Sequence, residues 1–334
     1  RGRPTLGGLD AVQRRGAGGA SEALVSSDQV APAPVAVPLW RSLLPFATAL
    51  ALLAFVLFRL DFAAFWRAVS STHYVLFFLF TIAFNLALLA ADVLATMHVY
   101  QRLVCPVRYA ELFVIRAASY LPSLVNHHVG QAWLTYFMSK IYQAPLWRVA
   151  GATLLVYATT FGCVFLIGAA SLPFNHGRVS WLAPTSLAIG LAGLAYMALI
   201  ALKPKIMRAR QATQVLVESG VRGHLLALVY RVPHVVVLFI GTWVPFAFFG
   251  VQIPLKDALV YIPIVMLVTA LPITPQGVGT RDLIALQLLA GYAPGAPEEQ
   301  AAAIAATTLS WACALTLVQA GFSPLFLRKA QRML

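Results

Sequence analysis

Seven long stretches without an acidic or basic side chain constrain the fold of this chain more than any other feature. They cover residues 42–58, 74–91, 149–175, 179–202, 235–255, 258–280 and 300–327. About 20 apolar residues in a helix cross the hydrocarbon core of a bilayer, and a helix satisfies its own backbone hydrogen bonds in lipid. The alternating strands of a membrane β-barrel do not occur in the sequence. The sequence therefore predicts an all-α, polytopic transmembrane helical bundle.

Composition excludes the main alternatives. Hydrophobic residues make up 60% of the 334 residues and charged residues 10%, against about 25% charged in an ordinary soluble domain. Such a chain has too few charges to solvate the surface of a soluble enzyme, and too many apolar residues to stay disordered. The three cysteines are scattered singly, which fits neither a metal site nor a disulfide framework.

The distribution of basic residues predicts the domain organisation and the orientation. Residues 1–38 are rich in Gly, Ala, Ser, Pro and Arg, and we expect a flexible cytoplasmic tail before a transmembrane domain at 39–334. A loop at 203–222 separates a first half, 39–202, from a second half, 224–327, and it carries five basic residues against Glu218. Basic loops stay on the cytoplasmic side. We therefore expect an integral protein of the bacterial plasma (inner) membrane with both termini in the cytoplasm.

Two apolar segments are interrupted in the same way. Residues 121–130 lie within the segment 109–146, and residues 271–279 lie within the segment 256–292. Both interruptions read Leu-Pro, a short polar stretch, then Val-Gly. The orientation makes them two re-entrant, broken hairpins that enter from opposite sides, as in an inverted repeat. Paired interruptions of this kind indicate a binding site near the bilayer midplane of a transporter.

The candidate binding residues follow from these interruptions. Unwound backbone at membrane depth requires a surrounding protein wall or a wet cavity, and helix N-termini at such a break favour an anion such as phosphate. We predict that the polar residues at and near the two breaks bind a lipid headgroup: Arg116, Asn126, His127, His128, Gln131, Thr274, Gln276, Gly277, Gly279, Arg281 and Asp282. No catalytic residue and no metal ligand is predicted, since adjacent histidines on a helix point in different directions and no carboxylate follows at ligand spacing.

Several of these charges also have simpler interpretations. Arg281 and Asp282 either face the cavity or form a local ion pair, and Arg116 either holds an anion or extends to the membrane surface. Asp92 lies near the end of an uncharged stretch, where we expect an interfacial or paired carboxylate rather than one with a role in the cavity. Arg231 and His234 precede an apolar run and either face the cavity or flank the membrane surface, of which we expect the second.

At the two breaks the sequence resembles the lysylphosphatidylglycerol synthase transmembrane region, also described as flippase-like integral membrane proteins. The second break, residues 271–282, follows the family pattern of Leu-Pro, a Ser or Thr, Pro, a Gly, then Gly-x-Arg-Glu, with Asp282 in place of Glu. At the first break Gly130 and Tyr136 fit, whereas His128 replaces an Arg and Gln131 replaces a Glu. The layout is similar over roughly residues 40–325.

Other charged family positions differ too. Leu134 stands for a later Arg, and Tyr157, Ala158 and Phe161 lie where the family carries a Glu-Arg pair and an Asp. The resemblance implies a polytopic helical fold with internal pseudo-symmetry and a role in moving or handling lipids. Some stand-alone members are associated with glycosyltransferases.

These observations predict a flippase-like protein that translocates or binds a headgroup through a midplane cavity. The expected partners are membrane lipids, either an anionic phospholipid or a polyprenyl-linked sugar. The alternative is an accessory subunit that transports nothing and docks a glycosyltransferase or another lipid-modifying enzyme. Self-association is a further expectation. Enzymatic activity, a cofactor and nucleic-acid binding are not expected, since the sequence contains no catalytic set and no basic-aromatic module.

Overall fold

The computed structural model describes residues 61–124, 126–175, 178–270, 277 and 279–334, and the isolated positions 47, 50–52, 54 and 58. The chain divides into two units, Arg1–Leu39 and Trp40–Leu334, and the described residues belong to the second. The predicted tail at 1–38 lies outside the described residues, as does most of the first predicted span, 42–58.

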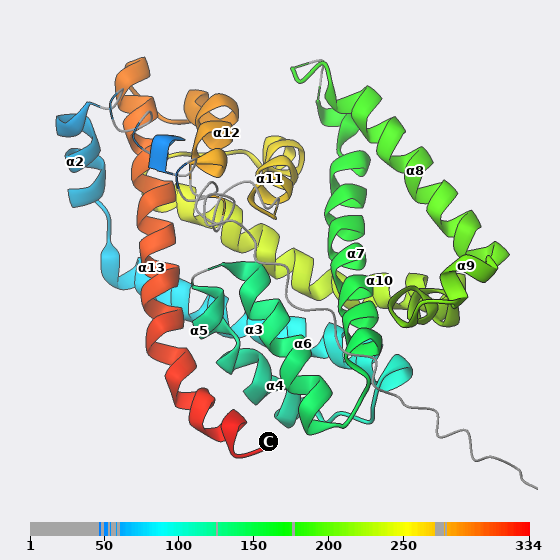
Figure 1. Ribbon diagram of the computed structural model, residues 1–334. Helices are drawn as coiled ribbons and strands as arrows, with labels where there is room; N and C mark the ends of the chain where they lie inside the picture. Colours follow the sequence, from blue (N-terminus) through cyan, green and yellow to red (C-terminus); the bar gives the residue numbers. More distant parts are fainter. Residues whose placement is uncertain are drawn as a thin grey trace, which may run out of the picture. The chain divides into compact units, whose positions relative to one another are not determined.

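Five helices of the described ranges are long and apolar enough to cross a membrane. They are α3 (Tyr74–Leu103), α7 (Leu146–Ala170), α8 (Leu182–Leu202), α10 (Gln211–Phe248) and α13 (Pro297–Gln331). Each overlaps one of the uncharged stretches that the sequence analysis identified, and α3 and α13 contain theirs completely. All the regular elements within the described ranges are helical, so the predicted helical membrane bundle is confirmed (Figure 1).

Shorter helices make up the two interrupted segments. The first consists of α4 (Tyr109–Ala118), the single turn α5 (Tyr120–Ser123) and α6 (His127–Ile141). The second consists of α11 (Leu255–Ala270) and α12 (Thr280–Leu289), followed by the 3₁₀ turn η3 (Ala290–Tyr292). None of these helices reaches the length of a full span, which agrees with the predicted interruption of both segments. The remaining elements are α2 (Phe62–Ser70), η1 (Leu172–Phe174) and α9 (Lys205–Arg208).

The bases of the two hairpins lie at opposite ends of α7. At the first base, the Tyr142 hydroxyl after α6 donates to Glu111 of α4 at 2.6 Å, and four residues later α7 begins. At the second base, Arg178, which follows α7, bonds both Asp257 of α11 and the hydroxyl of Tyr292, each at 3.2 Å. A helix of 25 residues is about 37 Å long. The two hairpins therefore extend into the bundle from opposite ends. That they re-enter a bilayer stays a prediction.

Electrostatic contacts at these bases change the ionisation of two tyrosines. Burial and the hydrogen bond to Glu111 hold the pKa of Tyr142 above its usual range. Burial and the neighbouring carboxylate of Asp257 do the same for the pKa of Tyr292. Both phenols therefore stay protonated at neutral pH, and Tyr142 donates to Glu111 whereas Tyr292 accepts from Arg178.

The predicted basic loop at 203–222 is wrong in its extent, because much of it is helical. Residues Lys205–Arg208 form α9, and α10 already begins at Gln211. A kink at Gly220, with φ 60° and ψ 177°, separates the first turns of α10 from the apolar part. Glycine tolerates this positive φ without a clash, so the chain can bend here and continue as helix.

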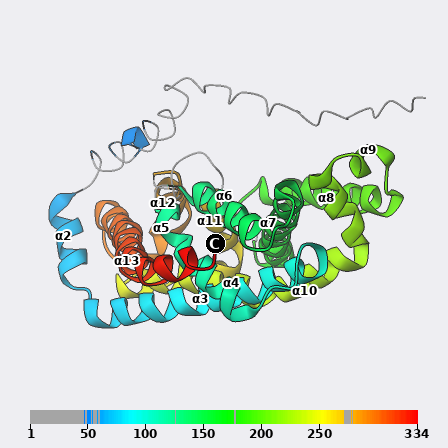
Figure 2. The same cartoon turned by 60° about the horizontal axis from the view of Figure 1, so that its bottom comes forward.

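Helices α3 and α10 lie side by side in both views, and the helices of the two interrupted segments lie on one face of this pair (Figures 1 and 2). Their close approach depends on Gly241 of α10, where an added Cβ would lie 1.9 Å from the ring of Phe84 on α3. Phe84 in turn packs on Trp311 of α13, with ring centroids 5.2 Å apart. Three helices far apart in the sequence are thereby fixed around one apolar contact.

Candidate functional site

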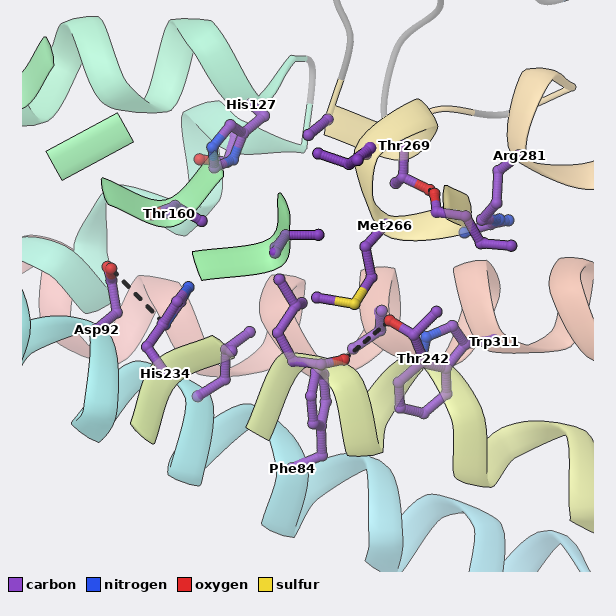
Figure 3. A pocket seen from close by; sticks show the side chains of 18 of the residues that line it. Phe84, Asp92, His127, Thr160, His234, Thr242, Met266, Thr269, Arg281 and Trp311 are labelled. Atoms are coloured by element: carbon purple, nitrogen blue, oxygen red, sulfur yellow. Dashed lines mark hydrogen bonds and ion pairs between the residues drawn. The ribbon is translucent and has the colours of Figure 1, made fainter. Parts of the chain in front are cut away.

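A cavity of about 340 Å³ lies where the two interrupted segments meet α3, α7, α10 and α13. Both breaks contribute to its wall. Asn126, His127 and His128 line it at the start of α6, and Thr269, Ala270 and Arg281 line it at the facing ends of α11 and α12. Figure 3 shows His127 and Arg281 on opposite sides of this space. The sequence predicted this meeting of the two breaks.

Local hydrogen bonds and a close helix contact fix the backbone conformation at the first break. Asn126 caps α6, since its side chain accepts from the backbone N–H of His128 at 2.8 Å. An added Cβ at Gly130 would lie 2.8 Å from the carbonyl oxygen of Ser119. Glycine at 130 therefore allows α6 to fold back tightly on the turn that ends α4.

At the second break the structure describes Gly277 and Gly279, with φ angles of 72° and 83°. Gly279 begins α12, and its N–H donates to the carboxylate of Asp282 at 2.9 Å. Arg281 is buried, lies 3.2 Å from Asp282 and donates to the carbonyl of Thr308 at 3.0 Å. The sequence analysis left two interpretations of Arg281 and Asp282 open, a cavity-facing pair and a local ion pair. The structure combines them, because Arg281 lines the cavity and also pairs with Asp282. Thr274 and Gln276 lie outside the described residues.

Helix α13 contacts both breaks through polar groups. Near its start, the carbonyl of Thr308 accepts from Arg281. Near its end, the buried hydroxyl of Ser323 donates to the carbonyl of Ala118 and accepts from the N–H of Leu121, both at 2.9 Å. These bonds satisfy backbone groups that the interruption of α4 leaves without helical partners. One long helix therefore positions both interrupted segments.

A buried ion cluster forms the floor of the cavity and was not predicted from the sequence. Asp92 of α3, 5% exposed, accepts from Arg116 of α4 at 2.6 Å and from Arg231 of α10 at 2.5 Å. Arg231 is 1% exposed and also donates to Thr96 at 3.3 Å. His234, one turn further along α10, lies with its Nδ1 3.8 Å from Asp92 (Figure 3).

This cluster corrects three expectations. Asp92 is paired, as expected, but it lies in the interior because α3 continues for eleven residues beyond it to Leu103. Arg231 and His234 do not flank the membrane surface. They are buried and line the cavity, because α10 begins twenty residues earlier than Arg231. Arg116 does not extend to a surface either, since Asp92 holds it inside.

Arg116 also has a neutral partner from the first break. The carboxamide of Gln131 on α6 suits its neighbours when its oxygen faces Arg116, and the oxygen then accepts from two guanidinium nitrogens at 2.6 and 2.7 Å. The guanidinium also lies 5.8 Å from the centre of the Tyr120 ring. Gln131 and Arg116 are thus joined across the first break, a contact that the sequence analysis did not predict.

The two adjacent histidines face the cavity with an aromatic neighbour. His127 and His128 are both exposed there, and their ring centroids lie 5.9 Å and 6.4 Å from that of Tyr157 on α7. In the part of the chain that the structure describes, the Tyr157 hydroxyl has no hydrogen-bond partner. Within the described ranges, no three side chains among His, Cys, Asp and Glu group closely enough to hold a metal. The three rings instead offer hydrogen-bonding groups to a polar guest.

The arginines of the site outnumber the carboxylates. Arg116, Arg231 and Arg281 line the cavity, against Asp92 in the wall and Asp282 beside Arg281, which leaves one positive charge in excess. Two buried nitrogens of the cluster, Nε of Arg231 and Nδ1 of His234, have no hydrogen-bond partner among the residues that the structure describes. A buried polar group without a partner costs roughly 1–3 kcal/mol. The arrangement therefore favours a ligand that brings negative charge and hydrogen-bond acceptors.

Comparison with known proteins agrees with this architecture. The family model described as "Lysylphosphatidylglycerol synthase TM region" matches residues 42–317, most of the chain. No curated protein and no solved structure matches the sequence. Family members are membrane domains of flippase-like, lipid-related proteins. With five helices among its described residues that are long and apolar enough to cross a membrane and with this match, the chain is an integral membrane protein that belongs to the lysylphosphatidylglycerol synthase transmembrane region family.

Proposed function

We propose that this chain binds the phosphate of a lipid headgroup in the cavity between the two breaks and carries the headgroup across the bilayer. The observation that carries the proposal is the excess of buried arginine over carboxylate in the cavity wall, together with the unpartnered nitrogens of Arg231 and His234. An uncompensated buried charge is costly, and a phosphodiester would supply the missing charge. The lipid is an anionic phospholipid or a polyprenyl-linked sugar.

The size and the lining of the cavity suit a lipid headgroup whose acyl or prenyl chains remain outside the cavity. A volume of about 340 Å³ is at the lower end of the range for small-molecule sites, roughly 300–1,000 Å³, so it can hold a headgroup but not a whole lipid. Apolar residues such as Leu88, Val164 and Leu315 complete the lining. The acyl or prenyl chains would then stay in the bilayer while the headgroup passes the midplane.

Individual residues take distinct roles in this proposal. Arg116 and Arg231 would bind phosphate oxygens, since guanidinium groups match their geometry bidentately. The start of α6, where Asn126 already uses one N–H, adds its positive dipole end. His127, His128 and Gln131 would bond the hydroxyl groups of the glycerol or sugar. Arg281 would bind the phosphate when the headgroup reaches the second break.

We further propose that the end of the bundle with Lys140, Arg148 and the basic α9 faces the cytoplasm, since basic segments stay on that side. The C-terminal Arg328 and Lys329 of α13 then also face the cytoplasm. The membrane would be the bacterial plasma membrane. In this orientation the first hairpin re-enters from the cytoplasm and the second from outside.

The test is headgroup movement in proteoliposomes. The protein is reconstituted with phosphatidylglycerol that carries a fluorophore on one acyl chain, and dithionite bleaches the outer leaflet. We expect wild-type protein to expose inner-leaflet probe, and an Arg281→Ala, His128→Ala double variant to lose at least tenfold in rate. Arg67→Ala removes an exposed arginine outside the cavity and should stay within twofold of wild type. Wild-type rates in the double variant would overturn the site, and no movement by wild type would overturn the function.

The alternative proposal is an accessory role without transport. It predicts that a glycosyltransferase or another lipid-modifying enzyme co-purifies in a fixed ratio and that the chain alone moves no lipid. We also propose that the chain has no catalytic activity of its own. Formation of a modified lipid by the purified chain would contradict that proposal.

A further inference from the structure

We infer that His234 is a proton-binding site that is coupled to the binding of the anionic headgroup, so that one proton and one phosphodiester enter the cavity together. This inference rests on the proposed function and adds a coupling ion to it. It starts from an imidazole that is 9% exposed, lines the cavity and has a ring nitrogen without a hydrogen-bond partner.

The groups around His234 make its charge depend on the occupant of the cavity. On the facing helix α3 lies Asp92, 3.8 Å from Nδ1. Two positive groups lie nearby, Arg231 on the same helix and Arg116 on α4, and both are bonded to Asp92. Across the cavity, Tyr157 of α7 and His127 of α6 also line the wall. In the structure two guanidinium groups bond Asp92, and the imidazole, at 3.8 Å, makes no hydrogen bond to it.

Binding of a phosphodiester changes this balance. The phosphate oxygens attract Arg116 and Arg231, which weakens or breaks their bonds to Asp92. A carboxylate that loses partners in a buried site needs another donor. If the imidazole takes up a proton from water, its Nδ1–H can donate to Asp92 after a shift of less than 1 Å from the present 3.8 Å to hydrogen-bond distance.

The charges balance in this step. The phosphodiester brings one negative charge and the proton brings one positive charge, so the total charge of the occupied cavity equals that of the empty one. One N–H bond forms on the imidazole, and one O–H bond of a hydronium ion breaks to supply the proton and leaves water. The same pairing would allow a proton gradient to drive headgroup movement without net charge transfer. Histidine suits this role because its unperturbed pKa of about 6.5 lies near physiological pH.

The test measures proton uptake directly. Detergent-solubilised full-length protein in weakly buffered solution at pH 7 is titrated with dihexanoylphosphatidylglycerol, and a pH indicator dye records proton exchange. This probe is a phosphodiester that does not titrate near pH 7, so protons taken up enter the protein. We expect uptake of about one proton per bound lipid in wild type. Binding without proton uptake would overturn the inference and leave the proposed function standing.

Variants assign the proton to one side chain. His234→Gln should take up no proton even when the probe is bound at saturating concentration, and its affinity at pH 7 should fall about tenfold or more because the proton no longer contributes to binding. His224→Gln is the matched control, because His224 is a buried histidine of the same helix that bonds Tyr196 and the Gly220 carbonyl instead of facing the cavity. It should retain full uptake. Loss of uptake in a His127→Gln, His128→Gln variant, with uptake retained in His234→Gln, would overturn the assignment.

Transport is the second measurement, and it distinguishes a failure of the proton coupling from a failure of the proposed function. In proteoliposomes, a gradient of one pH unit along the direction of movement should accelerate wild-type translocation several-fold and leave His234→Gln unchanged. Translocation by wild type that does not respond to the gradient would overturn the coupling alone. Absence of both binding and translocation in wild type would overturn the proposed function and the coupling with it.

Discussion

Replacement of Asp92 by asparagine should destabilise the protein more than loss of any exposed ion pair. The two residues have nearly the same shape, but asparagine carries no charge. Asp92 is 5% exposed and bonds two arginines at 2.6 and 2.5 Å, so the variant leaves both guanidinium groups buried without a counter-charge. Removing one partner of a buried pair costs roughly 3–5 kcal/mol, and water in the cavity lowers this toward the smaller value.

The assay is the thermal midpoint of the detergent-purified protein, followed by the loss of its monodisperse gel-filtration peak. We expect Asp92→Asn to lower this midpoint by roughly 5–10 °C, taking a few degrees per kcal/mol for a chain of this size. Asp257→Asn is the matched control. Its pair with Arg178 is exposed, and exposed pairs contribute about 0–1 kcal/mol, so its midpoint should fall by no more than about 2 °C.

A double variant tests the cause. Arg231→Gln in the Asp92→Asn background removes one of the two uncompensated charges, and part of the lost stability should return. Additive losses in the double variant, or a wild-type midpoint in Asp92→Asn alone, would refute the view that charge balance holds α3, α4 and α10 together.

Three further predictions concern packing and reactivity. Gly130→Val should lose about 1–3 kcal/mol of stability, because its Cβ would lie 2.8 Å from a backbone oxygen, whereas Gly291→Ala meets no atom within 4 Å and should be neutral in the same thermal assay. Ser323→Ala leaves a backbone N–H and a carbonyl of the first break unpaired and should cost about 1–3 kcal/mol, while Gly321→Ala on the same helix, with open space around it, should cost nothing. Burial raises the pKa of the Cys105 thiol to about 11, so its rate of maleimide labelling should rise about 100-fold from pH 7 to pH 9, as the thiolate fraction does. A rate that is flat over this range would show that access, not ionisation, limits the reaction.

The sequence allowed the helical bundle and the two breaks to be predicted because both depend on local signals. Uncharged stretches set the helices, and Pro and Gly at 121–130 and 271–279 set the interruptions. The ion cluster has no such local signal. Asp92 and Arg231 are 139 residues apart, and each lies near the end of an uncharged stretch, where a charge at the membrane surface is the common case. The spacing of Arg231 and His234, three residues apart and hence on one helix face, was a signal that could have indicated a shared partner.

Gln131 is one of the departures from the family pattern that set the charge of the cavity, and it gives a last prediction. Gln131 stands where the family resemblance expects Glu, and its oxygen accepts from Arg116 without bringing a charge. Gln131→Glu would therefore balance the arginines from within and repel an anionic guest. A carboxylate about 6–8 Å from a bound phosphate repels it by roughly 2–3 kcal/mol at an effective dielectric constant of about 20, so affinity for dihexanoylphosphatidylglycerol should fall roughly 30- to 150-fold. Gln300→Glu, at the exposed start of α13, should bind as wild type does. Unchanged affinity in Gln131→Glu would mean that the charge of the cavity does not select its ligand.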